Sequence, residues 1–60
     1  MLSGEIKSYA KQLYDRLGDR SIAHAAQQAS KASQTGKEKD AEMWRRIESA
    51  LLSIRGPHQA

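Results

Sequence analysis

A chain of 60 residues with a formal net charge of +3 and no cysteine holds one domain at most and neither a disulfide nor a thiolate metal site. Its two histidines, His24 and His58, are too few for a structural zinc site, so we expect no metal and no cofactor. No apolar run reaches the roughly 18 residues of a membrane span, and the first residues lack the basic start and apolar middle of a signal peptide. We therefore expect a cytoplasmic protein without a membrane segment.

The first predicted helix covers about residues 4–17. Its apolar side chains recur at helical spacing on one stripe, at Ile6, Tyr9, Ala10, Leu13, Tyr14 and Leu17. Ser3 can serve as the N-cap, and Gly18 suits the left-handed position that commonly follows a last helical turn.

The second predicted helix covers about residues 20–34 and is rich in alanine. Its predicted apolar face consists of Ile22, Ala25, Ala26, Ala29 and Ala32. Asp19 or Ser21 offers a side-chain oxygen to cap its first turn. Small side chains bury little area, so we expect a thin helix packed against bulkier neighbours, with His24 projecting from the opposite side into solvent.

The third predicted helix covers about residues 38–55 and has the widest apolar face. Its central stripe is Ala41, Trp44, Ile47, Leu51 and Ile54, and Met43, Ala50 and Leu52 widen it. Lys37 is a poor N-cap, whereas Gly56-Pro57 is a strong stop signal. Residues 57–60 then form a short, mobile tail.

The chain contains no valine or phenylalanine and no sustained alternation of apolar and polar residues, so strand signals are missing. The sequence therefore predicts an all-α fold, a three-helix bundle or helical hairpin array, with a single domain over residues 1–56.

Trp44 has two interpretations. It lies in phase with Ile47 and Leu51, which is typical of a core anchor, and tryptophan is also enriched at interface hot spots. Both interpretations of Trp44 hold if the apolar face of the third predicted helix is wider than one chain can cover. The predicted core and interface residues are Met43, Trp44, Ile47, Leu51 and Ile54.

Basic residues beside this face suggest an alternative function in nucleic-acid binding. The candidate phosphate contacts are Lys37, Lys39, Arg45, Arg46 and Arg55. Acidic residues are interleaved with them, at Glu38, Asp40, Glu42 and Glu48, and would repel a phosphate backbone.

No catalytic constellation is recognisable in the sequence. The serines lack a nucleophile elbow or an adjacent base, no glycine-rich phosphate loop exists, and neither histidine has a partner at metal-ligand or general-base spacing. We expect a non-enzymatic helical interaction module that binds another copy of itself or another protein.

Three features together resemble a group of small uncharacterised bacterial proteins, a domain of unknown function. They are Gly18-Asp19, the alanine-rich segment ending near Gly36, and Trp44-Arg45-Arg46-Ile47 followed by Leu51. The resemblance covers about residues 13–57, and Lys37 stands where the second Asp of the group's pattern would be. It implies an all-helical fold and gives no activity.

Overall fold

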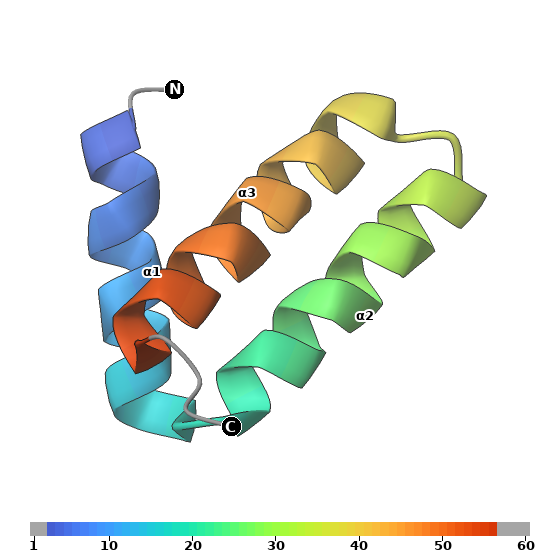
Figure 1. The fold of residues 1–60 in the computed structure, drawn as a ribbon. Helices are drawn as coiled ribbons and strands as arrows, with labels where there is room; N and C mark the ends of the chain where they lie inside the picture. The colour runs from blue at the N-terminus through green and yellow to red at the C-terminus, as the bar shows by residue number, and fades with distance from the viewer. Residues whose placement is uncertain (1–2, 57–60) are drawn as a thin grey trace.

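The computed structural model describes residues 3–56, which form three α-helices joined by short turns (Figure 1). They are α1 (Ser3–Leu17), α2 (Arg20–Gln34) and α3 (Glu38–Arg55). The all-α prediction is confirmed, and the predicted bounds agree to within one residue. The predicted tail at residues 57–60 lies outside the described residues. Within residues 3–56, no helix is both long and apolar enough to cross a membrane.

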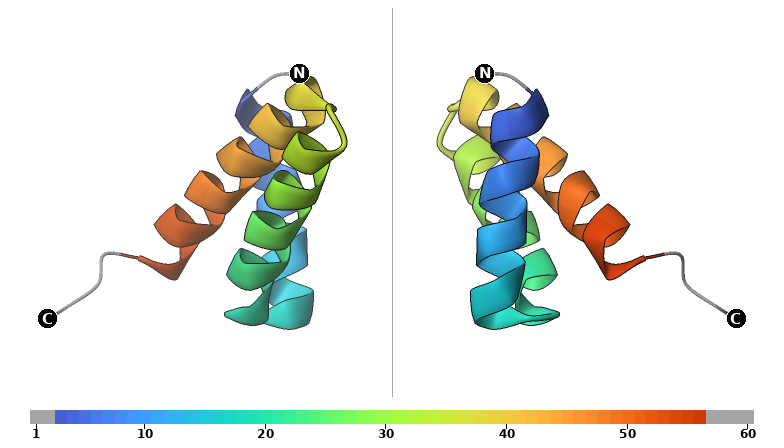
Figure 2. Two further views of the ribbon diagram at one scale, coloured as in Figure 1. Left: turned by 90° about the vertical axis from the view of Figure 1, so that its right-hand side faces the viewer. Right: turned by 90° about the vertical axis from the view of Figure 1, so that its left-hand side faces the viewer.

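The three helices do not form an evenly packed bundle. α2 and α3 run antiparallel and share the most extensive contact, whereas α1 diverges from α2 and packs mainly on α3 (Figure 1). Two side views show the C-terminal end of α3 tilting away from α1 and α2 (Figure 2). α3 is therefore the central element on which both other helices depend.

The predicted side-chain cap at the start of α2 is not formed in the turn between α1 and α2. Gly18 has a φ of 63°, and its N–H donates to the Tyr14 carbonyl at 2.7 Å. Asp19 occupies the N-cap position of α2, but its side chain makes no capping hydrogen bond within the described chain. Ser21 does not cap the helix either, because its hydroxyl donates to the Gly18 carbonyl at 2.6 Å. This bond ties the first turn of α2 back onto the end of α1.

The turn between α2 and α3 is a Schellman motif. The Lys37 N–H donates to the Ala32 carbonyl at 2.8 Å, and the Gly36 N–H donates to the Ser33 carbonyl at 3.2 Å. Gly36 takes a φ of 80°, which places it in the left-handed region that this motif requires. Lys37 precedes α3 without a side-chain cap in the described structure, as its side-chain chemistry predicts. The C-terminal cap of α2 therefore sets this turn.

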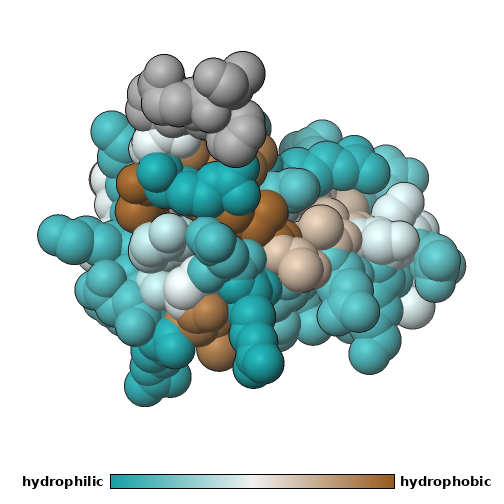
Figure 3. Space-filling model, turned by 60° about the horizontal axis from the view of Figure 1, so that its bottom comes forward, coloured by the Kyte–Doolittle hydropathy of each residue, from teal (hydrophilic) through white to brown (hydrophobic). Residues whose placement is uncertain are grey.

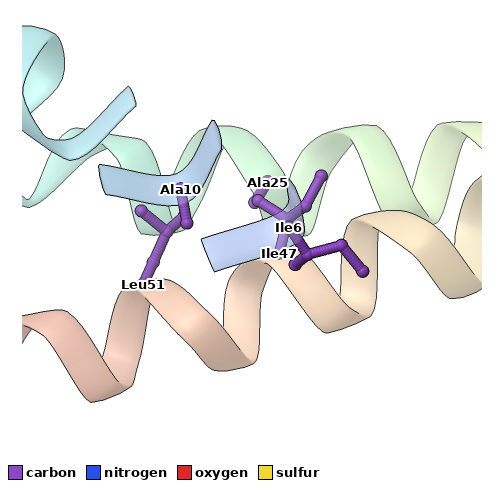
Figure 4. Packing of buried hydrophobic residues seen from close by; sticks show 5 residues of the cluster. All are labelled: Ile6, Ala10, Ala25, Ile47 and Leu51. Atoms are coloured by element: carbon purple, nitrogen blue, oxygen red, sulfur yellow. The ribbon is translucent and has the colours of Figure 1, made fainter. Parts of the chain in front are cut away.

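The core is small because alanine dominates it. Its central cluster joins Ile6 and Ala10 of α1, Ala25 of α2, and Ile47 and Leu51 of α3 (Figure 4). Among the described residues, five of the eight buried hydrophobic residues are alanines. Since each alanine buries little apolar area, the hydrophobic stabilisation depends on the three larger buried side chains and on the partly buried ones that pack against them, such as Trp44 and Met43.

The buried face of α2 is rotated relative to the predicted one. Ser21 and Ala25 are fully buried, whereas Ile22 and Ala26 are only half-buried. The hydroxyl of Ser21 tolerates burial because it is hydrogen-bonded to Gly18. The predicted apolar face is thus confirmed at Ala25, Ala29 and Ala32, whereas Ile22 and Ala26 lie at its edge and Ser21, which the sequence offers as a cap, is buried.

Candidate functional site

One ring from each helix meets at Trp44. The Trp44 ring centroid lies 6.2 Å from that of Tyr9 on α1, with the two planes at 70°. It lies 5.7 Å from that of His24 on α2, with the planes at 84°. Both are edge-to-face arrangements, which suit the charge distribution of aromatic rings. Trp44 is thus a half-buried junction between three helices.

His24 is less exposed than the sequence predicts. The sequence predicts a solvent-exposed histidine, but His24 is half-buried and packs against Trp44. The rotation of α2 explains the difference, because a buried Ser21 brings the position one turn later towards α3.

A groove of about 300 Å³ lies between α1 and the N-terminal half of α3. Its lining residues are Glu5, Ile6, Tyr9, Met43, Trp44 and Ile47. Ile6 and Ile47 are buried at its base, whereas Tyr9 is 45% exposed. Glu5 is the one charged residue of this lining. Apart from it, the groove offers apolar and aromatic surface.

The predicted core and interface residues divide into three groups. Ile47 and Leu51 are buried, and Met43 and Trp44 are half-buried around the groove. Ile54 is exposed, so it is not part of the core. The structure therefore brings four of these five residues together in or beside the core.

Large apolar side chains also remain exposed near the other end of the molecule. They are Leu17 at 39%, Leu52 at 42% and Ile54 at 37% exposure. A view towards the α1–α2 turn shows apolar surface in separate patches between hydrophilic side chains (Figure 3). On α3, Leu52 and Ile54 flank the buried Leu51, because each residue advances about 100° around the helix.

A polar contact links α1 to the start of α2. The Tyr14 hydroxyl donates to the Asp19 carboxylate, with 3.2 Å between the oxygens. Partial desolvation raises the pKa of the Tyr14 phenol above its ordinary value of 10.0, and the hydrogen bond to Asp19 and its negative charge act in the same direction. The positive charge of Arg55 opposes this shift in pKa, so α3 also acts electrostatically on this contact.

The predicted nucleic-acid contacts are all exposed but do not form one surface. The structure places Lys37, Lys39, Arg45, Arg46 and Arg55 on the solvent side. Lys39 and Arg46 line one hollow together with Asp40 and Glu42. Lys37 lines a different hollow, and Arg55 lies at the far end of α3. Acidic groups thus accompany Lys39 and Arg46 in their hollow.

The described residues hold no group of three or more histidine, cysteine, aspartate or glutamate side chains that could bind a metal ion. The imidazole of His24 instead packs against an aromatic ring.

Sequence reasoning missed Glu5, Tyr9 and His24 as neighbours of Trp44. A partial signal exists, since Tyr9 follows Ile6 at helical spacing and Glu5 precedes it on the edge of the same stripe. No comparable signal marks His24, because its contact depends on how α2 is rotated against α3.

Comparisons with known proteins give no match. No family model matches the sequence, and no curated protein and no solved structure matches it. The resemblance to small uncharacterised bacterial proteins therefore stays a hypothesis, and the functional argument rests on the groove and on the exposed part of α3.

Proposed function

We propose that this chain is a non-enzymatic helical interaction module that self-associates through the C-terminal half of α3. One observation carries the proposal: alanines form much of the core, while some large apolar side chains lie outside it. Most of the buried hydrophobic residues are alanines, whereas Leu52 and Ile54 are 42% and 37% exposed. Fully burying a leucine or isoleucine contributes about 1.5–3 kcal/mol relative to leaving it exposed. Association would supply part of that free energy to a domain with a small core of its own.

A second copy of the same chain fits this surface. The segment at residues 49–54 contains only serine, alanine, leucine and isoleucine, so it carries no charge. Two copies can bring this segment together without pairing like charges, although each chain has a net charge of +3. Leu52 and Ile54 lie about 160° apart around α3, so a two-fold arrangement would set Leu52 of one copy against Leu52 of the other and leave Ile54 outside the centre of the contact.

Molar mass in solution tests the proposal. Light scattering after size-exclusion chromatography, over a range of protein concentrations, is expected to give twice the mass of one chain at the upper end. Leu52→Ser should shift the dimer towards monomer, whereas Ile54→Ser, on the other side of α3, should have a smaller effect. Leu17→Ser is the matched control, because Leu17 has nearly the same exposure but lies on α1. Circular dichroism must show that each variant stays helical.

Two results would contradict self-association. One is a folded monomer at all concentrations up to about 1 mM, which corresponds to an association free energy weaker than about 4 kcal/mol. The other is a dimer that Leu52→Ser and Leu17→Ser weaken equally, since the contact would then not be specific to α3.

Nucleic-acid binding is the alternative proposal, and the charge distribution favours it less. Lys39 and Arg46 share their hollow with two carboxylates, which would repel phosphates. Titration of duplex DNA at low salt and at about 150 mM salt tests it. Binding that survives the higher salt and is lost in Arg45→Gln/Arg46→Gln would support the alternative, whereas binding that disappears indicates general electrostatic attraction.

We further propose that the protein is cytoplasmic and related to the small uncharacterised bacterial proteins that its sequence resembles. The absence of cysteine is compatible with a reducing compartment, although it does not require one. Fractionation of the source cells, with detection of the chain in the soluble fraction, tests the location.

A further inference from the structure

We propose that the groove between α1 and α3 binds the trimethylammonium head group of an organic cation. The inference goes beyond self-association and does not depend on it, because the groove lies on the N-terminal half of α3 and the uncharged segment on the C-terminal half. Three features of the groove carry the proposal: two aromatic walls, one carboxylate and an apolar base.

Tyr9 and Trp44 supply the aromatic walls. Both rings line the groove, and their planes meet at 70° with centroids 6.2 Å apart, so they form two sides of a corner. The faces of such rings attract a cation that lies within about 6 Å of the ring centroid. Quaternary ammonium groups suit this environment because their methyl groups spread the charge and need no hydrogen-bond acceptor.

Glu5 supplies the charge that selects a cation over a neutral group. It lines the groove together with the two rings, whereas the other lining side chains are uncharged. Two hollows share Ile6 with the groove: two basic and two acidic residues line one of them, and Lys7 and Arg46 line the other. Glu5 is therefore the one acidic residue of the groove lining that can attract a cation, in a chain whose total charge is positive.

The base and the size of the groove fit a head group better than a large ligand. Ile6 and Ile47 are buried beneath it, and Met43 adds a flexible thioether at its side. These side chains can contact methyl groups but cannot replace the hydrogen bonds that a primary ammonium makes with water. A volume of about 300 Å³ is at the lower end of the range of about 300–1,000 Å³ for small-molecule sites.

His24 holds one wall of the corner in place. It packs edge-to-face against Trp44 but is not among the residues that line the groove. Its imidazole therefore restricts the Trp44 ring from the α2 side and leaves the groove open. His24 is a positioning residue in this arrangement.

Titration with choline tests the proposal. Trp44 is the only tryptophan, so its fluorescence reports on the groove directly. The matched probe is 3,3-dimethylbutan-1-ol, which has the shape of choline but a neutral carbon in place of the nitrogen. Ionic strength is kept constant with sodium chloride. We expect saturable binding of choline with a Kd on the order of 1–10 mM, and binding of the neutral probe at least about five-fold weaker.

Three variants separate the contributions of charge and ring. Glu5→Gln should weaken choline binding about five-fold and leave the neutral probe unchanged. Tyr9→Leu should also weaken choline binding, whereas Tyr9→Phe keeps the ring and should bind as the wild type does. Glu5 and Tyr9 are exposed, so these substitutions are expected to leave the fold intact, which circular dichroism checks.

A trimethyl-lysine derivative, blocked at both ends, identifies the source of the head group. Tighter binding of this probe than of choline would support a methylated side chain, and the reverse would support a free small molecule. Equal affinity for choline and its neutral analogue would overturn the proposal, as would no saturation by about 100 mM, well above the expected Kd. A Tyr9→Leu variant that binds choline with wild-type affinity would also overturn it.

Discussion

The Trp44 indole and the His24 imidazole meet edge-to-face, with ring centroids 5.7 Å apart and planes at 84°. This contact joins α3 to α2 through two half-buried side chains, in a region where α2 otherwise presents alanine. Aromatic side chains thus supply part of the bulk that the alanine face of α2 lacks.

Replacement of His24 by alanine is expected to destabilise the fold. Loss of an edge-to-face pair costs about 0.5–1.5 kcal/mol, which lowers the melting temperature of a domain of this size by roughly 4–8 °C per kcal/mol. Thermal unfolding followed by circular dichroism measures this effect. Gln27→Ala on the exposed side of α2 is the control and should melt within about 2 °C of the wild type. Equal melting of both variants would show that the ring contact does not stabilise the fold.

Leu51 and Leu52 are adjacent leucines with opposite environments. Leu51 is fully buried in the core cluster, whereas Leu52 is 42% exposed. Leu51→Ala should cost about 2–5 kcal/mol, which is enough to unfold much of so small a domain. Leu52→Ala should cost under about 1 kcal/mol in the isolated chain. Urea denaturation at low protein concentration compares the two, and a similar loss of stability in both would contradict the assigned core.

Element positions could be predicted from local signals. Gly18, Gly36 and Gly56 follow the ends of the three helices, and all three take positive φ values of 63°, 80° and 93°. A residue without a Cβ adopts this conformation at little cost, so the stop signals are readable in the sequence. Ile47 and Leu51 were likewise predictable as core residues, because they lie in phase on the widest apolar stripe.

The candidate site could be predicted only in part, because it depends on contacts between helices. Hydrophobic periodicity identifies Trp44 as important but does not show which rings it meets. The rotation of α2 follows from Ser21, whose burial requires the hydrogen bond to Gly18. The Tyr9 contact follows from the divergence of α1 from α2, which no local pattern encodes.

Gly36 provides a test of the Schellman turn. Its φ of 80° is unfavourable for any residue with a Cβ, although no atom outside its immediate neighbourhood lies within 4 Å of where that Cβ would be. Gly36→Ala should therefore cost about 1–2 kcal/mol through backbone strain alone. Gly4→Ala is the control, since Gly4 is helical, and it should be neutral or stabilising by about 0.5 kcal/mol. Chemical denaturation measures both, and equal effects would contradict the role of the turn.

The contact between Tyr14 and Asp19 predicts how stability depends on pH. Because the pKa of Tyr14 is raised in the folded protein above its ordinary value of 10.0, folding favours the neutral phenol. The resulting stabilisation is fully present below pH 10 and is lost as the pH rises through the raised pKa. The free energy of unfolding of the wild type should therefore fall more steeply above pH 10 than that of Tyr14→Phe. Urea denaturation between pH 8 and about pH 11.5 measures the two slopes, across the range where a phenol titrates.

One further variant identifies the cause of this pH dependence. Asp19→Asn keeps a hydrogen-bond acceptor beside Tyr14 but removes the negative charge that helps to raise its pKa, so its slope should lie between those of the wild type and Tyr14→Phe. Parallel curves for the wild type and Tyr14→Phe would show that the phenol is no more shielded in the folded chain than in the unfolded one.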